Sequence, residues 1–169
     1  MRLLLAVAAV VSSLLCSCST SSPELAKAKV YRSGQVDNAT YYKVKTTAYS
    51  HVEADSLKYG KSNAAGGTLK YGMVRSAAAD WSVFPLGTVF KIEGEPYLYQ
   101  VDDYGSALVG TKTIDLYKPN SDGIKQWGAR NVRIKVLKWG SYASSMNVLC
   151  QRTSYSHVRA MIGGIQKKI

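Results

Sequence analysis

Alternating apolar and polar residues recur in short runs along the middle of this chain. In the clearest run, residues 131–139 (NVRIKVLKW), Val132, Ile134, Val136 and Leu137 supply an apolar face while arginine and lysine point mostly outward. This period of two is typical of a strand with one buried face. Four further runs that favour strands precede it, at residues 41–49, 89–93, 97–101 and 111–117, and residues 73–81 predict a strand end that runs into a short helical turn. Short strands at close spacing, with little helix between them, indicate a six-stranded closed β-barrel.

The segments between these runs carry turn and capping residues. Residues 85–88 (PLGT) and 94–96 (GEP) predict turns, and Ser121 can cap a short helix over residues 122–127 that Gly128 ends. Residues 141–169 lack a firm period, and we expect one or two short helices there that end in a basic segment. The fold class is therefore mainly β, with short helices and a partly helical C-terminal tail.

A polar loop follows the first predicted strand. Residues 51–72 contain four glycines, and a loop of this length is a candidate flap over a site. His51, Glu53 and Asp55 alternate at its start and could be imagined as metal ligands. Because the other histidine of the chain, His157, lies far along the sequence, we interpret them as a solvated strand end and expect no metal and no cofactor.

The N-terminus has the pattern of an export signal. Arg2 precedes an apolar run over residues 3–15 that is too short to span a bilayer comfortably, and small polar residues follow it. Leu15-Cys16-Ser17-Cys18 resembles the bacterial lipobox, which implies a lipid on Cys18. We therefore divide the chain into a signal (1–17), a lipidated tether (18–40), a barrel (41–140) and a basic extension (141–169).

The resemblance to a lipobox also predicts where the protein is located. It implies a lipid-anchored protein of the cell envelope, and Ser19 after the cysteine fits delivery to an outer membrane that faces the periplasm. If Cys16 leaves with the signal and Cys18 is acylated, Cys150 remains alone, which excludes an internal disulfide and a zinc cluster. Cys150 lies in an apolar run, and we expect it to be a small buried hydrophobe.

The chain is strongly basic, with a formal net charge of +11. Such a balance predicts attraction to a polyanion. Behind an export signal, the cell wall with its peptide carboxylates or an anionic lipid fits better than nucleic acid, because the basic residues are dispersed rather than clustered. We expect peptidoglycan glycan strands and a membrane as partners, no nucleic acid, and a monomer.

Three aspartates, Asp80, Asp103 and Asp115, lie within a short span around the predicted turn at residues 85–88. Asp115 lies inside the apolar run 113–117 (TIDLY), where a carboxylate is costly to bury as a charge. Such a group must be paired, hydrogen-bonded or kept protonated. Three of them in one region predict a site.

Six motifs in order make these residues resemble a known family. They are residues 47–50 (TAYS), 78–80 (AAD), 85–88 (PLGT), 103–105 (DYG), 114–117 (IDLY) and 127–130 (WGAR). Together they resemble the 3D domain, named for its three aspartates, which membrane-bound lytic transglycosylase A shares with muralytic proteins of spore formers. The resemblance covers about residues 44–139 and implies a double-psi β-barrel with an open groove for a glycan strand.

The resemblance also implies an activity. Members cleave the β-1,4 bond between N-acetylmuramic acid and N-acetylglucosamine without water and leave a 1,6-anhydro sugar, which makes the enzyme a lyase. By position, Asp115 matches the catalytic aspartate, with Asp103 and Asp80 as the other two. Thr47 and Tyr49 match groove residues, and Tyr104 and Gly105 of the 103–105 motif are further candidates for substrate binding.

This chemistry can run on one carboxyl group. The C6 hydroxyl of the same sugar is the nucleophile, so no second carboxyl is needed to activate water. The acid must start protonated, which requires a pKa raised by apolar surroundings or by nearby carboxylates. We therefore expect Asp115 to be the acid and base, and Asp80 and Asp103 to position or polarise it.

Several features depart from the family pattern and leave alternatives open. Ser106 replaces a usual glycine, Val109 a usual lysine, and one extra residue precedes Asp115. Asp102 stands beside Asp103, so either could match the second aspartate. One alternative is a non-catalytic barrel that binds peptidoglycan. Another is a glycan-strand enzyme like rare lipoprotein A, although that family usually has a histidine in the segment before the PLGT turn.

Overall fold

The computed structural model describes residues 41–53 and 57–169. The predicted signal, the lipobox with Cys18 and the predicted tether lie outside the described residues. Within this part of the chain, no helix is both long and apolar enough to cross a bilayer.

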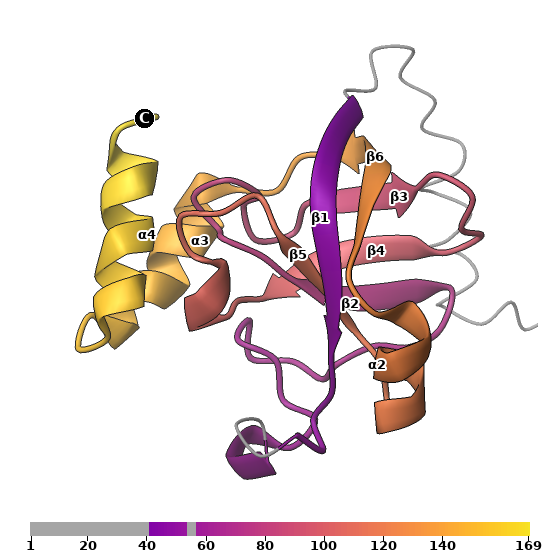
Figure 1. Cartoon of the computed structure of the whole chain (residues 1–169). Coiled ribbons are helices and arrows are strands. Elements are labelled where there is room, and N and C mark those ends of the chain that lie inside the picture. Colours follow the sequence, from indigo (N-terminus) through magenta and orange to yellow (C-terminus); the bar gives the residue numbers. More distant parts are fainter. Residues whose placement is uncertain (1–40, 54–56) are drawn as a thin grey trace, which may run out of the picture.

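The described strands close into a barrel in the order β1-β5-β2-β4-β3-β6 (Figure 1). Their bounds are β1 Tyr41–Tyr49, β2 Val74–Ala78, β3 Val89–Ile92, β4 Leu98–Asp103, β5 Ile114–Tyr117 and β6 Arg130–Lys138. The pairs β1–β5 and β2–β4 are parallel, and the remaining neighbours are antiparallel. The prediction of a six-stranded barrel is confirmed, and closure leaves no unpaired sheet edge.

The helices follow local signals in the sequence. Helix α2 (Ser121–Trp127) begins at Asn120, whose side chain accepts from the Gly123 amide, and it ends at Gly128, whose φ of +63° suits glycine. The predicted cap, Ser121, is thus the first helical residue. Helices α3 (Tyr142–Leu149) and α4 (Ser156–Gln166) form the tail. Figure 1 shows these two helices together on one side of the barrel.

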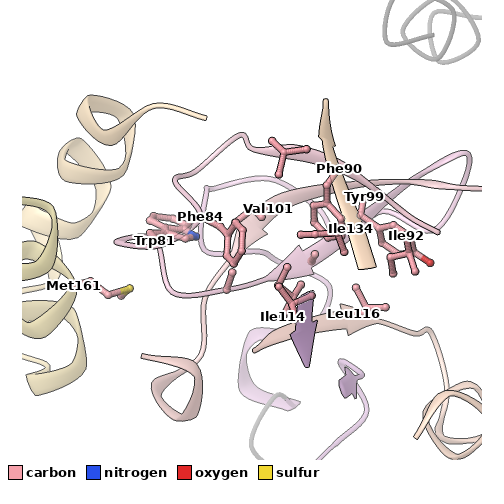
Figure 2. Close-up of a cluster of buried hydrophobic side chains, with 14 of the residues drawn as sticks. Trp81, Phe84, Phe90, Ile92, Tyr99, Val101, Ile114, Leu116, Ile134 and Met161 are labelled. Carbon is pink, nitrogen blue, oxygen red and sulfur yellow. The ribbon is translucent and has the colours of Figure 1, made fainter. Parts of the chain in front are cut away.

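Apolar side chains from the strands fill the barrel. Figure 2 shows Phe90, Tyr99, Ile114 and Ile134 among them, all fully buried. The same cluster continues into the tail through Leu149, Val158, Met161 and Ile165. Cys150, in contrast, is exposed, which corrects the expectation of a buried residue. It follows the last turn of α3, so the apolar run around it faces the core through Leu149 instead.

The PLGT turn is fixed by a close backbone approach. The Thr88 hydroxyl donates to the Pro85 carbonyl over 2.6 Å, and the Gly140 amide donates to the Thr88 hydroxyl over 3.0 Å. A Cβ at Gly140 would lie 2.3 Å from the Leu86 carbonyl oxygen, so no larger residue fits there. This contact ties the end of β6 to the turn that precedes β3.

Candidate active site

Two of the three predicted aspartates lie in one row across the barrel. Thr47 of β1 is paired in register with Asp115 of β5, Asp115 with Ala78 of β2, and Ala78 with Asp103 of β4. Residues paired across strands project to the same face of a sheet. Asp115 and Asp103 are two strands apart, which corresponds to about 10 Å between their Cα atoms. Ala78 lies between them in the register.

A bulge decides which of the two adjacent aspartates joins this row. Ala77 pairs with Val101 and Ala78 with Asp103, so β4 has one extra residue at this point, and that residue is Asp102. Asp102 is buried, and its Oδ2 accepts from Ser76 Oγ over 2.8 Å and from Lys70 Nζ over 2.9 Å. Asp103 is therefore the one that faces Asp115, and Asp102 belongs to a separate ion pair.

Asp103 is held by a fixed set of donors. The Tyr49 hydroxyl donates to its Oδ2 over 3.0 Å, and the amides of Ala64 and Tyr104 donate to its Oδ1 over 3.1 and 2.9 Å. Burial raises its pKa to about 6, although these three hydrogen bonds favour the charged form and oppose the shift. Asp103 is thus oriented by the protein itself before any ligand arrives.

Asp115, unlike Asp103, has a carboxylate oxygen without a hydrogen-bond donor in the described part of the chain. Its Oδ1 is buried and accepts no hydrogen bond from the described residues. Burial raises the pKa of Asp115 to about 6; the Thr47 side chain opposes the shift, and Glu53 and Asp103 add to it. The residue as a whole is half-buried, and a half-buried carboxyl with a raised pKa is suited to give a proton to a ligand and to take one back.

Asp80 has both carboxylate oxygens occupied by the backbone. The Ser82 amide donates to Oδ1 over 2.8 Å and the Gly110 amide to Oδ2 over 2.7 Å. The residue is 2% exposed. It connects the turn after β2 with the loop that leads to β5, so its contacts fit a positioning role rather than proton transfer.

The predicted substrate-binding residues divide into two groups. Thr47 and Tyr49 lie at the carboxylate row, and burial together with Asp103 raises the pKa of Tyr49 far above its ordinary value, so its hydroxyl stays a donor. Tyr104 and Gly105 follow Asp103. The Tyr104 ring packs edge-on against Trp81 at 5.0 Å and its hydroxyl accepts from Arg152 over 3.2 Å, which directs it toward the tail.

Glu53 is the residue that the sequence reasoning missed. Its side chain is exposed, as expected for a solvated strand end, but the sequence did not indicate that its carboxylate is the first of the two that raise the pKa of Asp115. Its Oε2 accepts from the Ser50 amide over 2.8 Å, which anchors it just beyond the end of β1. The available signal was its place after a strand that pairs with β5. Nearby, His51 Nδ1 lies 2.8 Å from the Tyr117 hydroxyl.

No metal cluster is formed by the part of the chain that the structure describes: no three histidine, cysteine, aspartate or glutamate side chains there are placed to hold an ion. The Asp115 site is instead built from two carboxyls, a tyrosine and a threonine on neighbouring strands.

Comparisons with known proteins find a family for the part of the chain that contains this site. The family model described as the 3D domain matches residues 75–138, which include Asp80, Asp103 and Asp115. A protein of Bacillus subtilis (strain 168), YabE, whose name refers to cell wall shaping, is 40% identical over 60 residues. That alignment covers 36% of this chain and 14% of YabE, so the chain spans a small part of that relative. The resemblance to the 3D family is thus confirmed over residues 75–138.

Proposed function

We propose, from the premise that residues 75–138 match the 3D domain, that this protein is a peptidoglycan lytic transglycosylase. It cleaves the β-1,4 bond between N-acetylmuramic acid and N-acetylglucosamine without water. The observation that carries the proposal is the state of Asp115, a half-buried carboxyl in one row with Asp103 whose raised pKa suits a single acid and base. A relative named for cell wall shaping supports the choice of polymer.

The reaction can be written on this one carboxyl. Protonated Asp115 gives its proton to the glycosidic oxygen as the bond from C1 to that oxygen breaks. The C6 hydroxyl of the same muramic acid bonds to C1 and closes the 1,6-anhydro ring, and its proton passes to the Asp115 carboxylate. No water is consumed, and the acid is regenerated for the next turnover.

The neighbouring groups prepare Asp115 for this cycle. The carboxylates of Asp103 and Glu53 favour its protonated form, so the acid is available closer to neutral pH. The Tyr49 hydroxyl donates to Asp103 over 3.0 Å and so holds the Asp103 carboxylate in one orientation relative to Asp115. Asp80 holds the loop before β5 through the Gly110 amide.

Mass spectrometry of the products tests the proposal. The full chain is incubated with purified peptidoglycan, and we expect anhydro-muropeptides that Asp115→Asn abolishes, because the amide cannot transfer a proton while it keeps the same shape. Asp122→Asn, on the exposed first turn of α2, is the matched control and should retain activity. Unchanged anhydro release by Asp115→Asn, with an intact fold, would overturn the assignment.

The same experiment separates the alternatives. Products with reducing ends would indicate a hydrolase, and cleavage confined to strands stripped of peptide would favour an enzyme like rare lipoprotein A. Binding without release would indicate a non-catalytic peptidoglycan-binding protein, to which the basic charge of +11 would equally contribute.

The proposed location is the outer membrane, with a lipid on Cys18 and the barrel in the periplasm. The support is the lipobox-like segment ending at Cys18, which lies outside the described residues, and the cell wall reference in the name of the relative. Cys18→Ser removes the acylated thiol, so we expect the protein to move from the membrane fraction to the soluble fraction. Unchanged membrane association in fractionated cells would contradict this.

A further inference from the structure

Beside the carboxylate site, positive and aromatic side chains alternate in what we term the cation–aromatic row. It consists of Tyr97, Arg75, Tyr71, Lys118, Trp127 and Arg130. The Arg75 guanidinium lies 3.3 Å from the ring centre of Tyr97 and 4.1 Å from that of Tyr71. Lys118 Nζ lies 5.9 Å from the ring centre of Tyr71 and 4.6 Å from that of Trp127, and the Arg130 guanidinium 4.2 Å from Trp127.

The two central cations of the row are buried without a carboxylate partner. Arg75 is 8% and Lys118 is 6% exposed. The ion pairs formed among the described residues are Lys70 with Asp102 and Arg133 with Glu93, so neither central cation has one. Lys118 Nζ also donates no hydrogen bond within the described chain, yet it is not among the fully enclosed polar atoms. Its ammonium nitrogen therefore keeps some contact with solvent.

Burying an ammonium group in this way costs free energy. Burial lowers the pKa of Lys118, and the charges of Arg75 and Arg130 lower it further, against an opposing contribution from Glu95. Aromatic faces recover part of the cost. An anion placed at Lys118 would recover more, because it would neutralise a cation that the protein leaves unpaired.

The row continues from the carboxylate site. The Tyr71 ring meets Tyr117 edge-on at 6.2 Å, and Tyr117 meets Tyr49 at 5.7 Å. Lys118 follows the end of β5, three residues after Asp115, or about 10 Å along an extended chain. Its amide donates to the Tyr49 carbonyl over 2.8 Å. The ring contacts through Tyr117 and Tyr71 thus connect the surroundings of Asp115 with those of Lys118.

We propose that Lys118, supported by Arg75, forms a subsite for a carboxylate carried by the glycan strand. This rests on the proposed function, because it takes the strand at Asp115 to be peptidoglycan. Muramic acid presents such a carboxylate either on its lactyl group, when the peptide is absent, or on the stem peptide. The exposed Tyr71 ring, 5.9 Å from Lys118 Nζ, provides an apolar surface beside the ammonium group that suits the carbon skeleton next to the carboxylate.

Binding measured in an inactive background tests the subsite. The full chain carrying Asp115→Asn is titrated with three soluble probes: glycan strands with stem peptides, strands stripped of peptide, and neutral oligomers of N-acetylglucosamine. Lys118→Met should weaken binding of a carboxylate-bearing probe about tenfold, the loss expected for one charge-assisted contact, and leave the neutral oligomers unaffected. Lys118→Arg should restore binding.

The controls make each outcome decisive. Lys91→Met removes an exposed cation on β3, outside the row, and should change none of the affinities. The probe whose binding drops identifies the source of the carboxylate, lactyl group or peptide. Equal loss for neutral and charged probes, or no loss for either charged probe, would overturn the subsite. Lys118→Gln gives the same comparison if the methionine variant fails to fold.

Failure of this subsite and failure of the proposed function remain distinguishable. Every variant in the titration already lacks the catalytic carboxyl, so the readout does not depend on cleavage. Lys118-dependent binding by a protein that releases no anhydro product would leave the subsite intact and remove the transglycosylase. Anhydro products together with Lys118-independent binding would do the reverse.

Discussion

Because burial raises the pKa of Asp115, the stability of the protein should depend on pH even without a substrate. Its pKa is about 6 in the folded protein against an ordinary value of 3.8. Between these values the folded state binds more protons than the unfolded state, so stability falls as pH rises from about 4 to about 6. The contribution is fully present below the unfolded pKa and lost above the folded one.

Asp115→Asn should remove the part of the fall in stability with rising pH that comes from Asp115. At pH 7 we expect the variant to be more stable than the natural chain by about 1–3 kcal/mol, because a buried charge is replaced by a neutral amide. The difference should shrink toward pH 4, while a dependence from Asp103, whose pKa is also about 6, persists in both proteins. Urea unfolding at pH 4 and pH 7 measures it, with Asp122→Asn as control. A less stable asparagine variant at pH 7 would contradict the raised pKa.

At the scale of single residues, the sequence located the aspartates but not their partners. The spacing of residues 80, 103 and 115 marked a site, and two of them do meet across Ala78. The choice between Asp102 and Asp103 depends on a bulge in β4, which pairing with β2 produces and no local pattern reveals. Glu53 was missed for the same reason, since its proximity to Asp115 arises from the parallel pairing of β1 with β5.

At the scale of elements, strands were easier to predict than helices. The period of two gave β1 at residues 41–49 and β6 within one residue of its bounds. The buried residues of α4, Val158, Met161 and Ile165, do follow a helical spacing, but two adjacent glycines in the second half of the helix weaken the local preference for one. The two glycines differ in their surroundings.

Gly164 lies against the turn after β2, whereas Gly163 faces open space. A Cβ at Gly164 would lie 2.8 Å from Cβ and Oγ of Ser82, and Gly163 has nothing within 4 Å. Ser82 cannot move freely, because its amide is bonded to Asp80 and its carbonyl accepts from Lys168. Gly164→Ala should therefore lower the free energy of unfolding by about 1–3 kcal/mol.

Gly163→Ala is the matched control, and it should stabilise the protein by about 0.5–1 kcal/mol through its higher helix propensity. Thermal unfolding of the two variants measures the contrast directly. If both substitutions raised the melting temperature by the same amount, the close approach of α4 to Ser82 would be wrong.

At the scale of the whole molecule, the tail and the barrel share one core. The sequence reasoning treated residues 141–169 as an extension, because their composition differs from that of the barrel. In the structure, Met161 of α4 is fully buried and lies in the same cluster as Trp81 and Phe84 (Figure 2). The Tyr104 hydroxyl accepts from Arg152, so the tail also contacts the residue next to Asp103. The tail is thus linked to the barrel both through the core and through this hydrogen bond.

This arrangement predicts that tail and barrel unfold together. Met161→Ala removes a fully buried side chain and should lower the free energy of unfolding by about 2–5 kcal/mol. Because the core is shared, tryptophan fluorescence, which includes Trp81, and far-ultraviolet circular dichroism should report one transition at the same lowered midpoint. Gln166→Ala, exposed at the end of α4, is the control and should leave the midpoint nearly unchanged. A tail that docked as an independent unit would instead melt first, and the fluorescence of the barrel would keep its original midpoint.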